Sequence, residues 1–173
     1  VAGTHGKTTT TSILAWALER AGVKPSFLVG GVAENFSSSF RLADGEYFVI
    51  EGDEYDTAYF DKGPKFMHYL PDTVVLNNVE FDHADIYRDE AHYASAFERF
   101  VALVPPDGRI AVSAAWPAAV ALARAGRAQV VTYAVVPVHQ ADVQARDLTH
   151  HPDGVRFALV DHGRRLGPVH LAV

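Results

Sequence analysis

Short apolar runs alternate with amphipathic stretches along the first half of the chain. The apolar positions of residues 8–21 recur at helical spacing, and Gly22 suits a helix C-terminus, so this segment is predicted to be a helix. Three short apolar runs follow, at residues 27–29, 47–50 and 73–76. Continuous apolar runs of this length are typical of strands covered on both faces, as in a parallel sheet.

The same alternation continues beyond residue 90. The apolar positions of residues 91–104 share one helical face, and a Pro-Pro-Asp-Gly turn follows at 105–108. A strand is then expected at 109–112, a helix at 117–125 and a strand at 130–133. This order predicts an α/β fold of the P-loop type, with a mostly parallel sheet flanked by helices.

From Val138 onward the pattern changes to short alternating runs separated by turns. Runs at 143–146, 155–160 and 166–173 are divided by turn residues at 151–154 and 161–163. This arrangement predicts a small antiparallel β meander at the C-terminal end. We therefore expect one domain over residues 1–173, with a parallel α/β core at 1–137 and an antiparallel β subdomain at 138–173.

Composition narrows the classes of function. The 173 residues are 49% hydrophobic and 21% charged, which is ordinary for a globular domain. The net charge of −6 disfavours a nucleic-acid partner, and no apolar run approaches the roughly 18 residues of a membrane span. The absence of cysteine excludes disulfides and thiolate metal sites. With no signal-peptide pattern, we expect a cytoplasmic protein; its oligomeric state stays open.

The strongest chemical signal is the string Gly3-Thr4-His5-Gly6-Lys7-Thr8-Thr9-Thr10. Glycines allow a tight loop whose N–H groups point at one anion, and the following helix adds its positive dipole end. Lys7 would reach the β- and γ-phosphates of a nucleotide, and the Thr8 hydroxyl would bind Mg²⁺. The residues expected to hold the phosphates are Gly3, Thr4, His5, Gly6, Lys7, Thr8 and Thr9.

This string departs from the general phosphate-loop pattern at one place, because Val1 stands where the first glycine should be. The alternative is a glycine-rich turn before a helix. We prefer the phosphate loop, because the lysine, the threonines and the helix all occur where phosphate binding needs them. Such a loop follows a strand, so we also expect the chain to be part of a longer polypeptide.

Acidic residues follow the second apolar run, in the string Glu51-Gly52-Asp53-Glu54-Tyr55-Asp56. Glu51 comes directly after the strand, at the sheet edge where α/β proteins bind ligands, and a carboxylate there can hold Mg²⁺. Asp53, Glu54 and Asp56 are interpreted as a solvated acidic loop.

The third apolar run is followed by the string Asn77-Asn78-Val79-Glu80-Phe81-Asp82-His83-Ala84-Asp85. His83 could ligate a metal or contact a substrate carboxylate. By itself, however, an Asp-His pair is more often a hydrogen bond within a loop.

In this order the three strings resemble those of the central domain of the Mur ligase family. The resemblance implies an ATP- and Mg²⁺-dependent ligase, in which a carboxylate is phosphorylated to an acyl phosphate and an amine then forms the amide. By family matching, Lys7, Glu51 and His83 are catalytic, and Thr8, Glu51 and His83 are metal ligands. Several family members also carry a carbamylated lysine after the Asp-His motif. Residues 90–104 contain no lysine, so the second metal site stays open.

Within the family, residues 51–62 and 65–71 most resemble the branch that acts in peptidoglycan recycling. That branch joins the tripeptide L-Ala-γ-D-Glu-meso-diaminopimelate to UDP-N-acetylmuramate. The alternative is the branch that adds L-alanine, which typically carries serine where Tyr55 stands. The N-terminal UDP-binding and C-terminal acceptor-binding domains of the family are expected to lie outside these residues.

Two other classes were weighed against a ligase. A nucleotide-hydrolysing switch usually reads guanine through an Asn-Lys-x-Asp string, which this sequence lacks. A domain that only binds nucleotide is disfavoured by the presence of Lys7, Thr8 and Glu51.

Overall fold

The computed structural model describes residues 1–82, 84–135 and 140–172. Its contacts divide the chain into two compact units, Val1–Leu70 with Asn77–Phe100, and Pro71–Leu76 with Val101–Val173. The subdomain boundary expected at residues 137 and 138 lies outside the described residues, and the second unit continues on both sides of it. None of the helices described is long and apolar enough to cross a membrane.

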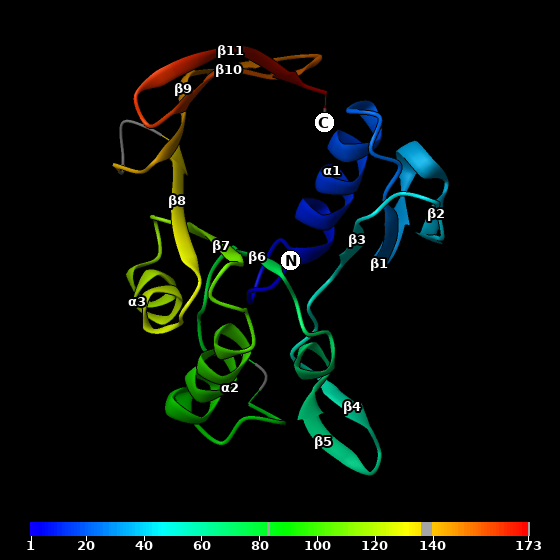
Figure 1. The fold of residues 1–173 in the computed structure, drawn as a ribbon, viewed down its shortest axis with the longest axis vertical. Helices are drawn as coiled ribbons and strands as arrows, with labels where there is room; N and C mark the ends of the chain where they lie inside the picture. Colours follow the sequence, from blue (N-terminus) through cyan, green and yellow to red (C-terminus); the bar gives the residue numbers. More distant parts are fainter. Residues whose placement is uncertain (83, 136–139, 173) are drawn as a thin grey trace. The chain divides into compact units, whose positions relative to one another are not determined.

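The first unit is built on helix α1 (Lys7–Arg20) and a three-stranded sheet. Strand β1 (Ser26–Ala33) is central, and it pairs parallel with β3 (Phe48–Ile50) and antiparallel with β2 (Ser38–Arg41). Figure 1 shows α1 lying beside this sheet. The cluster of buried apolar side chains consists of Ala15, Phe27, Val29, Ala33 and Val49.

Only one face of this sheet is covered within the first unit, so the expectation of two covered faces is wrong for β1 and β3. Phe27 and Val29 are buried, whereas Leu28 between them is 44% exposed and Phe48 is 54% exposed. The reason is geometric: side chains alternate between the two faces of a strand, and α1 packs on one of them. The predicted parallel pairing of the two strands is confirmed.

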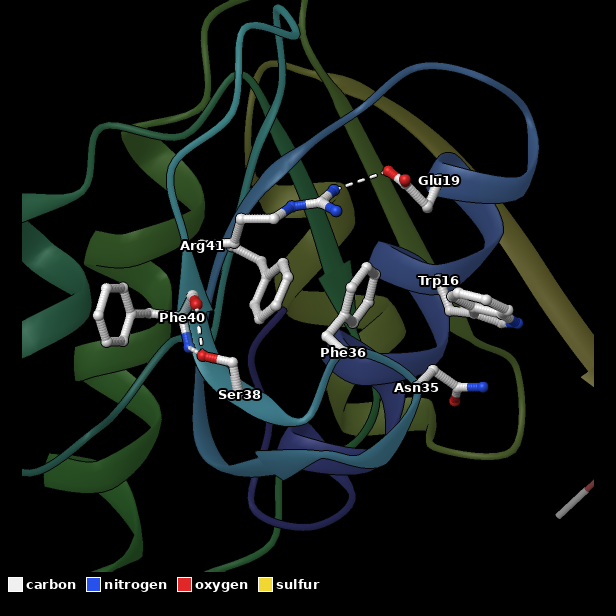
Figure 2. Close-up of a pocket in the computed structure, with 8 residues that line it drawn as sticks. Trp16, Glu19, Asn35, Phe36, Ser38, Phe40 and Arg41 are labelled. Atoms are coloured by element: carbon white, nitrogen blue, oxygen red, sulfur yellow. Dashed lines mark hydrogen bonds and ion pairs between the residues drawn. The ribbon is translucent and has the colours of Figure 1, made fainter.

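A hollow beside α1 is lined by aromatic rings and Arg41, and the 3₁₀ helix η1 (Glu34–Phe36) forms one wall (Figure 2). The Arg41 guanidinium lies over the Phe36 ring at 4.7 Å and donates to Glu19 Oε2 at 2.7 Å and to Pro25 O at 2.9 Å. The Arg41 hydrogen bond lowers the pKa of the Glu19 carboxyl. Arg41 therefore links β2 to α1. Because its contacts hold these two elements together, we interpret the hollow as a feature of their packing.

The next segment of the first unit lies, in sequence, between β3 and helix α2 (Glu90–Ala102). Strands β4 (Asp56–Ala58) and β5 (Asp61–Pro64) form a hairpin that the sequence did not predict, and the 3₁₀ helix η2 (Lys65–His68) follows. Phe66 of η2 is completely buried, and its ring lies 5.3 Å from Phe97 and 4.4 Å from Phe100. These ring contacts fix the segment after the hairpin against α2.

The second unit contains a six-stranded sheet in the order β11-β10-β9-β8-β7-β6. Its strands are β6 (Thr73–Leu76), β7 (Arg109–Ser113), β8 (Gln129–Val135), β9 (Val143–His151), β10 (Gly154–Asp161) and β11 (Arg164–Leu171). Helix α3 (Pro117–Ala125) connects β7 to β8. Strands β6 to β9 are parallel, whereas β9, β10 and β11 form the antiparallel meander.

The meander continues the parallel sheet, because β9 pairs directly with β8 through Tyr133 and Val143. The mixed α/β fold with a parallel-rich sheet and C-terminal antiparallel strands is therefore confirmed. Leu76, Ile110 and Val112 are completely buried in the middle of this unit.

We predict that Phe66→Ala destabilises the protein by about 3–5 kcal/mol, because it leaves a cavity between two aromatic rings. The matched control is Phe60→Ala at the hairpin tip, where the ring is 91% exposed, and it should change stability by less than about 0.5 kcal/mol. Urea unfolding of both variants measures the difference. Equal losses of stability would contradict the packing described for Phe66.

Candidate active site

The first two residues run between two strand ends, as a strand before a phosphate loop should. Gly52 N donates to Val1 O at 2.6 Å on one side, and Asn77 N donates to Ala2 O at 3.0 Å on the other. Ala2 is completely buried. These bonds place the start of the loop between the acidic string at residues 51–56 and the string at residues 77–85 that begins with two asparagines.

Asn78 holds the loop itself. Its backbone oxygen accepts from Thr4 N at 3.2 Å, and its side chain accepts from His5 N at 2.7 Å and donates to His5 O at 3.2 Å. The N–H groups of Thr4 and His5 therefore point at Asn78 in this structure, and their expected contact with phosphate stays a prediction. Asn78 accepts the hydrogen bonds of both N–H groups. It is thus a loop-positioning residue that sequence reasoning missed.

Thr4 is buried and serves the loop's structure with its side chain. Its hydroxyl donates to Glu80 O at 2.9 Å and accepts from Glu80 N at 3.0 Å. The Tyr93 hydroxyl lies 3.0 Å from the Thr4 hydroxyl and donates to it, because the single Thr4 proton goes to Glu80. Burial raises the pKa of Tyr93, so this tyrosine stays protonated. The Thr4 hydroxyl is thus fully engaged within the protein.

Helix α1 presents its N-terminus without a side-chain cap. Gly6 precedes it in the left-handed conformation, with a φ of 76° that glycine adopts at little cost. The Thr8 and Thr9 side chains on its first turn are exposed. The uncapped N–H groups and the helix dipole make this turn suitable for phosphate oxygens; phosphate binding by Gly6, Lys7, Thr8 and Thr9 stays a prediction.

Lys7 folds back onto the loop. Its ammonium donates to Gly3 O at 2.8 Å, to Thr4 O at 3.1 Å and to Glu54 Oε1 at 2.8 Å. The Lys7 side chain is 14% exposed and that of Glu54 is 0% exposed. The interpretation of Glu54 as part of a solvated loop is therefore wrong. Its burial depends on the tertiary contacts of the segment after β3, which the acidic string does not reveal.

Tyr87 helps to hold Glu54 in place. The Tyr87 hydroxyl donates to Glu54 O at 2.7 Å, and burial raises the pKa of Tyr87 to about 12. The neutral hydroxyl therefore remains a donor over the whole physiological pH range.

Glu51 meets Thr8 at the start of α1. Thr8 Oγ1 donates to Glu51 Oε1 at 2.8 Å, and Gly30 N donates to Glu51 Oε2 at 2.7 Å. Octahedral Mg²⁺ with bonds of about 2.0–2.1 Å places neighbouring ligands about 2.9 Å apart. The two oxygens already stand near that separation, and both are of the kind that Mg²⁺ prefers, so the pair fits this ion.

No group of three or more His, Cys, Asp or Glu side chains in the described ranges could hold a metal. Mg²⁺ is usually bound by one or two protein ligands, with water and phosphate oxygens completing its coordination. His83, the other predicted ligand, lies outside the described residues.

The remaining acidic residues of the string make ion pairs near the hairpin. Asp53 pairs with Lys65 at 2.7 Å and Asp56 pairs with Lys62 at 2.8 Å.

The model of the Mur ligase middle domain matches residues 1–172. The chain belongs to the Mur ligase family. Among curated Mur ligases, the UDP-N-acetylmuramate–L-alanyl-γ-D-glutamyl-meso-2,6-diaminoheptandioate ligase of Escherichia coli (strain K12) is 53% identical over 117 residues, which are 68% of this chain and 25% of that protein. The UDP-N-acetylmuramate–L-alanine ligase of Salinispora arenicola (strain CNS-205) is 38% identical over 176 residues, covering 100% of this chain and 33% of that protein.

A solved structure of the same family has the same fold. The UDP-N-acetylmuramate:L-alanyl-γ-D-glutamyl-meso-diaminopimelate ligase from Neisseria meningitides superimposes with a TM-score of 0.84 and 41% identity. The match covers 99% of this chain and 54% of that one. The chain thus spans about a quarter to a third of the length of the curated Mur ligases named above.

We predict that Gly3→Ala weakens binding of an ATP analogue roughly tenfold or more, because the loop must distort to accept a side chain. Gly3 has a φ of 134°, and a Cβ there would lie 2.8 Å from Asn78 O. The control is Gly163→Ala, where φ is 82° and no atom lies within 4 Å of the added Cβ. Calorimetry on the intact protein compares the two. Unchanged affinity in the Gly3 variant would show that the loop does not hold the nucleotide.

Proposed function

We propose that the protein containing this domain is an ATP-dependent ligase of the peptidoglycan recycling pathway. It joins the tripeptide L-Ala-γ-D-Glu-meso-diaminopimelate to UDP-N-acetylmuramate. The observation that carries the ligase chemistry is the uncapped start of α1, where Thr8 meets Glu51 and the Lys7 ammonium lies on the loop at Gly3 O. The choice of acceptor is supported by the 53% identity to the tripeptide ligase over 117 residues, against 38% to the L-alanine ligase over 176 residues.

In the proposed reaction, a carboxylate oxygen of UDP-N-acetylmuramate attacks the γ-phosphorus of ATP and ADP leaves. The acyl phosphate formed is then attacked at its carbonyl carbon by the tripeptide amine, which loses a proton as inorganic phosphate leaves. The domain's task is to fix the phosphates and to offset the charge that develops on the transferred group.

Each loop residue has a part in this task. The Lys7 ammonium would contact the β- and γ-phosphates, and the N–H groups of residues 6–9 would receive phosphate oxygens. Thr8 Oγ1 and the Glu51 carboxylate would hold Mg²⁺, which supplies positive charge beside the phosphates when bound. Gly3, Thr4 and His5 would shape the loop through Asn78 and Glu80. His83 would serve as the ligand of a second metal, as the family resemblance implies.

Other parts of the reaction need residues beyond this domain. An acyl phosphate reacts productively only when the amine is held close and water is kept away. We propose that UDP-binding and acceptor-binding domains supply these functions, and that the protein works in the cytoplasm, where its ATP and UDP-linked substrates are found.

We predict that the intact protein, given ATP, Mg²⁺, UDP-N-acetylmuramate and equal amounts of both acceptors, forms mainly the tripeptide product. The family resemblance of residues 55–62 to the tripeptide branch supports this preference. Mass spectrometry of the mixture identifies the product. A dominant alanine product would assign the protein to the L-alanine ligases. Hydrolysis of ATP with neither amide formed would contradict the ligase assignment itself.

A further inference from the structure

The Lys7 ammonium has no donor left for a nucleotide in this structure. An ammonium group has three N–H donors, and the acceptors Gly3 O, Thr4 O and Glu54 Oε1 lie within 3.1 Å of Nζ. A phosphate oxygen can therefore bind Lys7 only by displacing at least one of them. Which acceptor leaves decides where the ammonium stands during phosphoryl transfer.

The three acceptors differ in how readily they can be given up. Gly3 O and Thr4 O are neutral carbonyls of the loop itself. Glu54 has a side chain that is 0% exposed, and removing its cation would leave a buried carboxylate without that partner, which is strongly unfavourable. The Glu54 contact also joins two opposite charges, an attraction that the two carbonyl contacts lack. A phosphate should displace the carbonyls and leave the Glu54 contact intact.

The backbone around Glu54 is fixed independently of the loop. Phe66 N donates to Asp53 O at 3.1 Å, Lys65 N donates to Tyr55 O at 3.0 Å, and the Tyr87 hydroxyl donates to Glu54 O at 2.7 Å. The residues on either side of Glu54 are thus hydrogen-bonded to the start of η2. This gives the carboxylate a rigid support that can set the position of a flexible lysine.

We propose that Glu54 is a positioning residue, whose buried carboxylate keeps the Lys7 ammonium at the phosphate loop both before and after the nucleotide binds. The proposal rests on the ligase function above, because it assigns Glu54 a part in phosphoryl transfer through Lys7. In this arrangement one N–H of Lys7 stays on Glu54, and the two N–H groups now on Gly3 O and Thr4 O turn to phosphate oxygens.

We predict that Glu54→Gln in the intact enzyme lowers kcat for ligation about ten- to a hundredfold, the range expected for a lost charged hydrogen bond. The KM for ATP should change by no more than a few fold, since removal of a carboxylate near the phosphates offsets the looser hold on Lys7. Kinetics are measured well below the unfolding temperature of each protein, so that a loss of stability alone would leave kcat unchanged. The matched control is Glu46→Gln, at an exposed glutamate of the same unit.

Thermal unfolding of a double-mutant cycle tests whether Glu54 acts with Lys7. Lys7→Met should lower Tm because it leaves the Glu54 carboxylate buried without its cation, and adding Glu54→Gln should recover part of that loss. The double variant has no buried charge at either position, so it should fold even if Lys7→Met does not.

Two results would overturn the proposal. One is a kcat for Glu54→Gln within threefold of both the parent and Glu46→Gln. The other is an additive cycle, in which Glu54→Gln lowers Tm equally with and without Lys7. In either case, loss of activity in the Lys7→Met variant would still support the proposed phosphate site. Full ligase activity of Lys7→Met would instead contradict the proposed function.

Discussion

The site depends on the hydrogen bonds that hold the phosphate loop between two strand ends. Val1 O and Ala2 O accept from Gly52 N and Asn77 N, and the Asn78 side chain accepts from His5 N and donates to His5 O. Because the backbone is fixed there, helix α1 begins at a defined point. The Thr8 hydroxyl and the Lys7 ammonium, both on the first turn of α1, are thereby aimed at their partners.

The carboxylate partners, Glu51 for Thr8 and Glu54 for Lys7, come from a single short segment. They lie only three residues apart, but their surroundings differ. Glu51 directly follows β3 and lies beside Thr8, where its oxygens are placed for Mg²⁺. Glu54 is completely shielded from solvent and pairs with Lys7. The first carboxylate is accessible to an ion, whereas the second needs a permanent cation from the protein. The same string therefore supplies the proposed Mg²⁺ ligand and the proposed support of Lys7.

Local pattern predicted the three α-helices and most strands, but not β2 or the β4–β5 hairpin, and it predicted the part of the site that follows from strand ends. The expected bounds of β6 and α3 agree with the structure, because apolar periodicity and flanking turn residues define them. The meeting of Glu51 with Thr8 could be predicted, since both lie where a strand ends beside a helix start.

Other features depend on tertiary contacts that no local pattern encodes. The burial of Glu54 requires Lys7, Tyr87 and the start of η2 to come together. The hydrogen bonds of Asn78 with His5 join residues 73 positions apart, and the β4–β5 hairpin has no regular apolar alternation in its sequence. Family resemblance, carried by the three strings, reached further than physical pattern alone, since it assigns His83 an expected role that stays a prediction.

The most direct test is a crystal structure of the intact protein with a non-hydrolysable ATP analogue and Mg²⁺. We predict that the phosphates lie at the first turn of α1, with Lys7 Nζ bound to a phosphate oxygen and still to Glu54. Thr8 Oγ1 and Glu51 should ligate the Mg²⁺ ion. Phosphates bound elsewhere, or a Lys7 ammonium that keeps its contacts with Gly3 O and Thr4 O while the nucleotide is bound, would contradict this account.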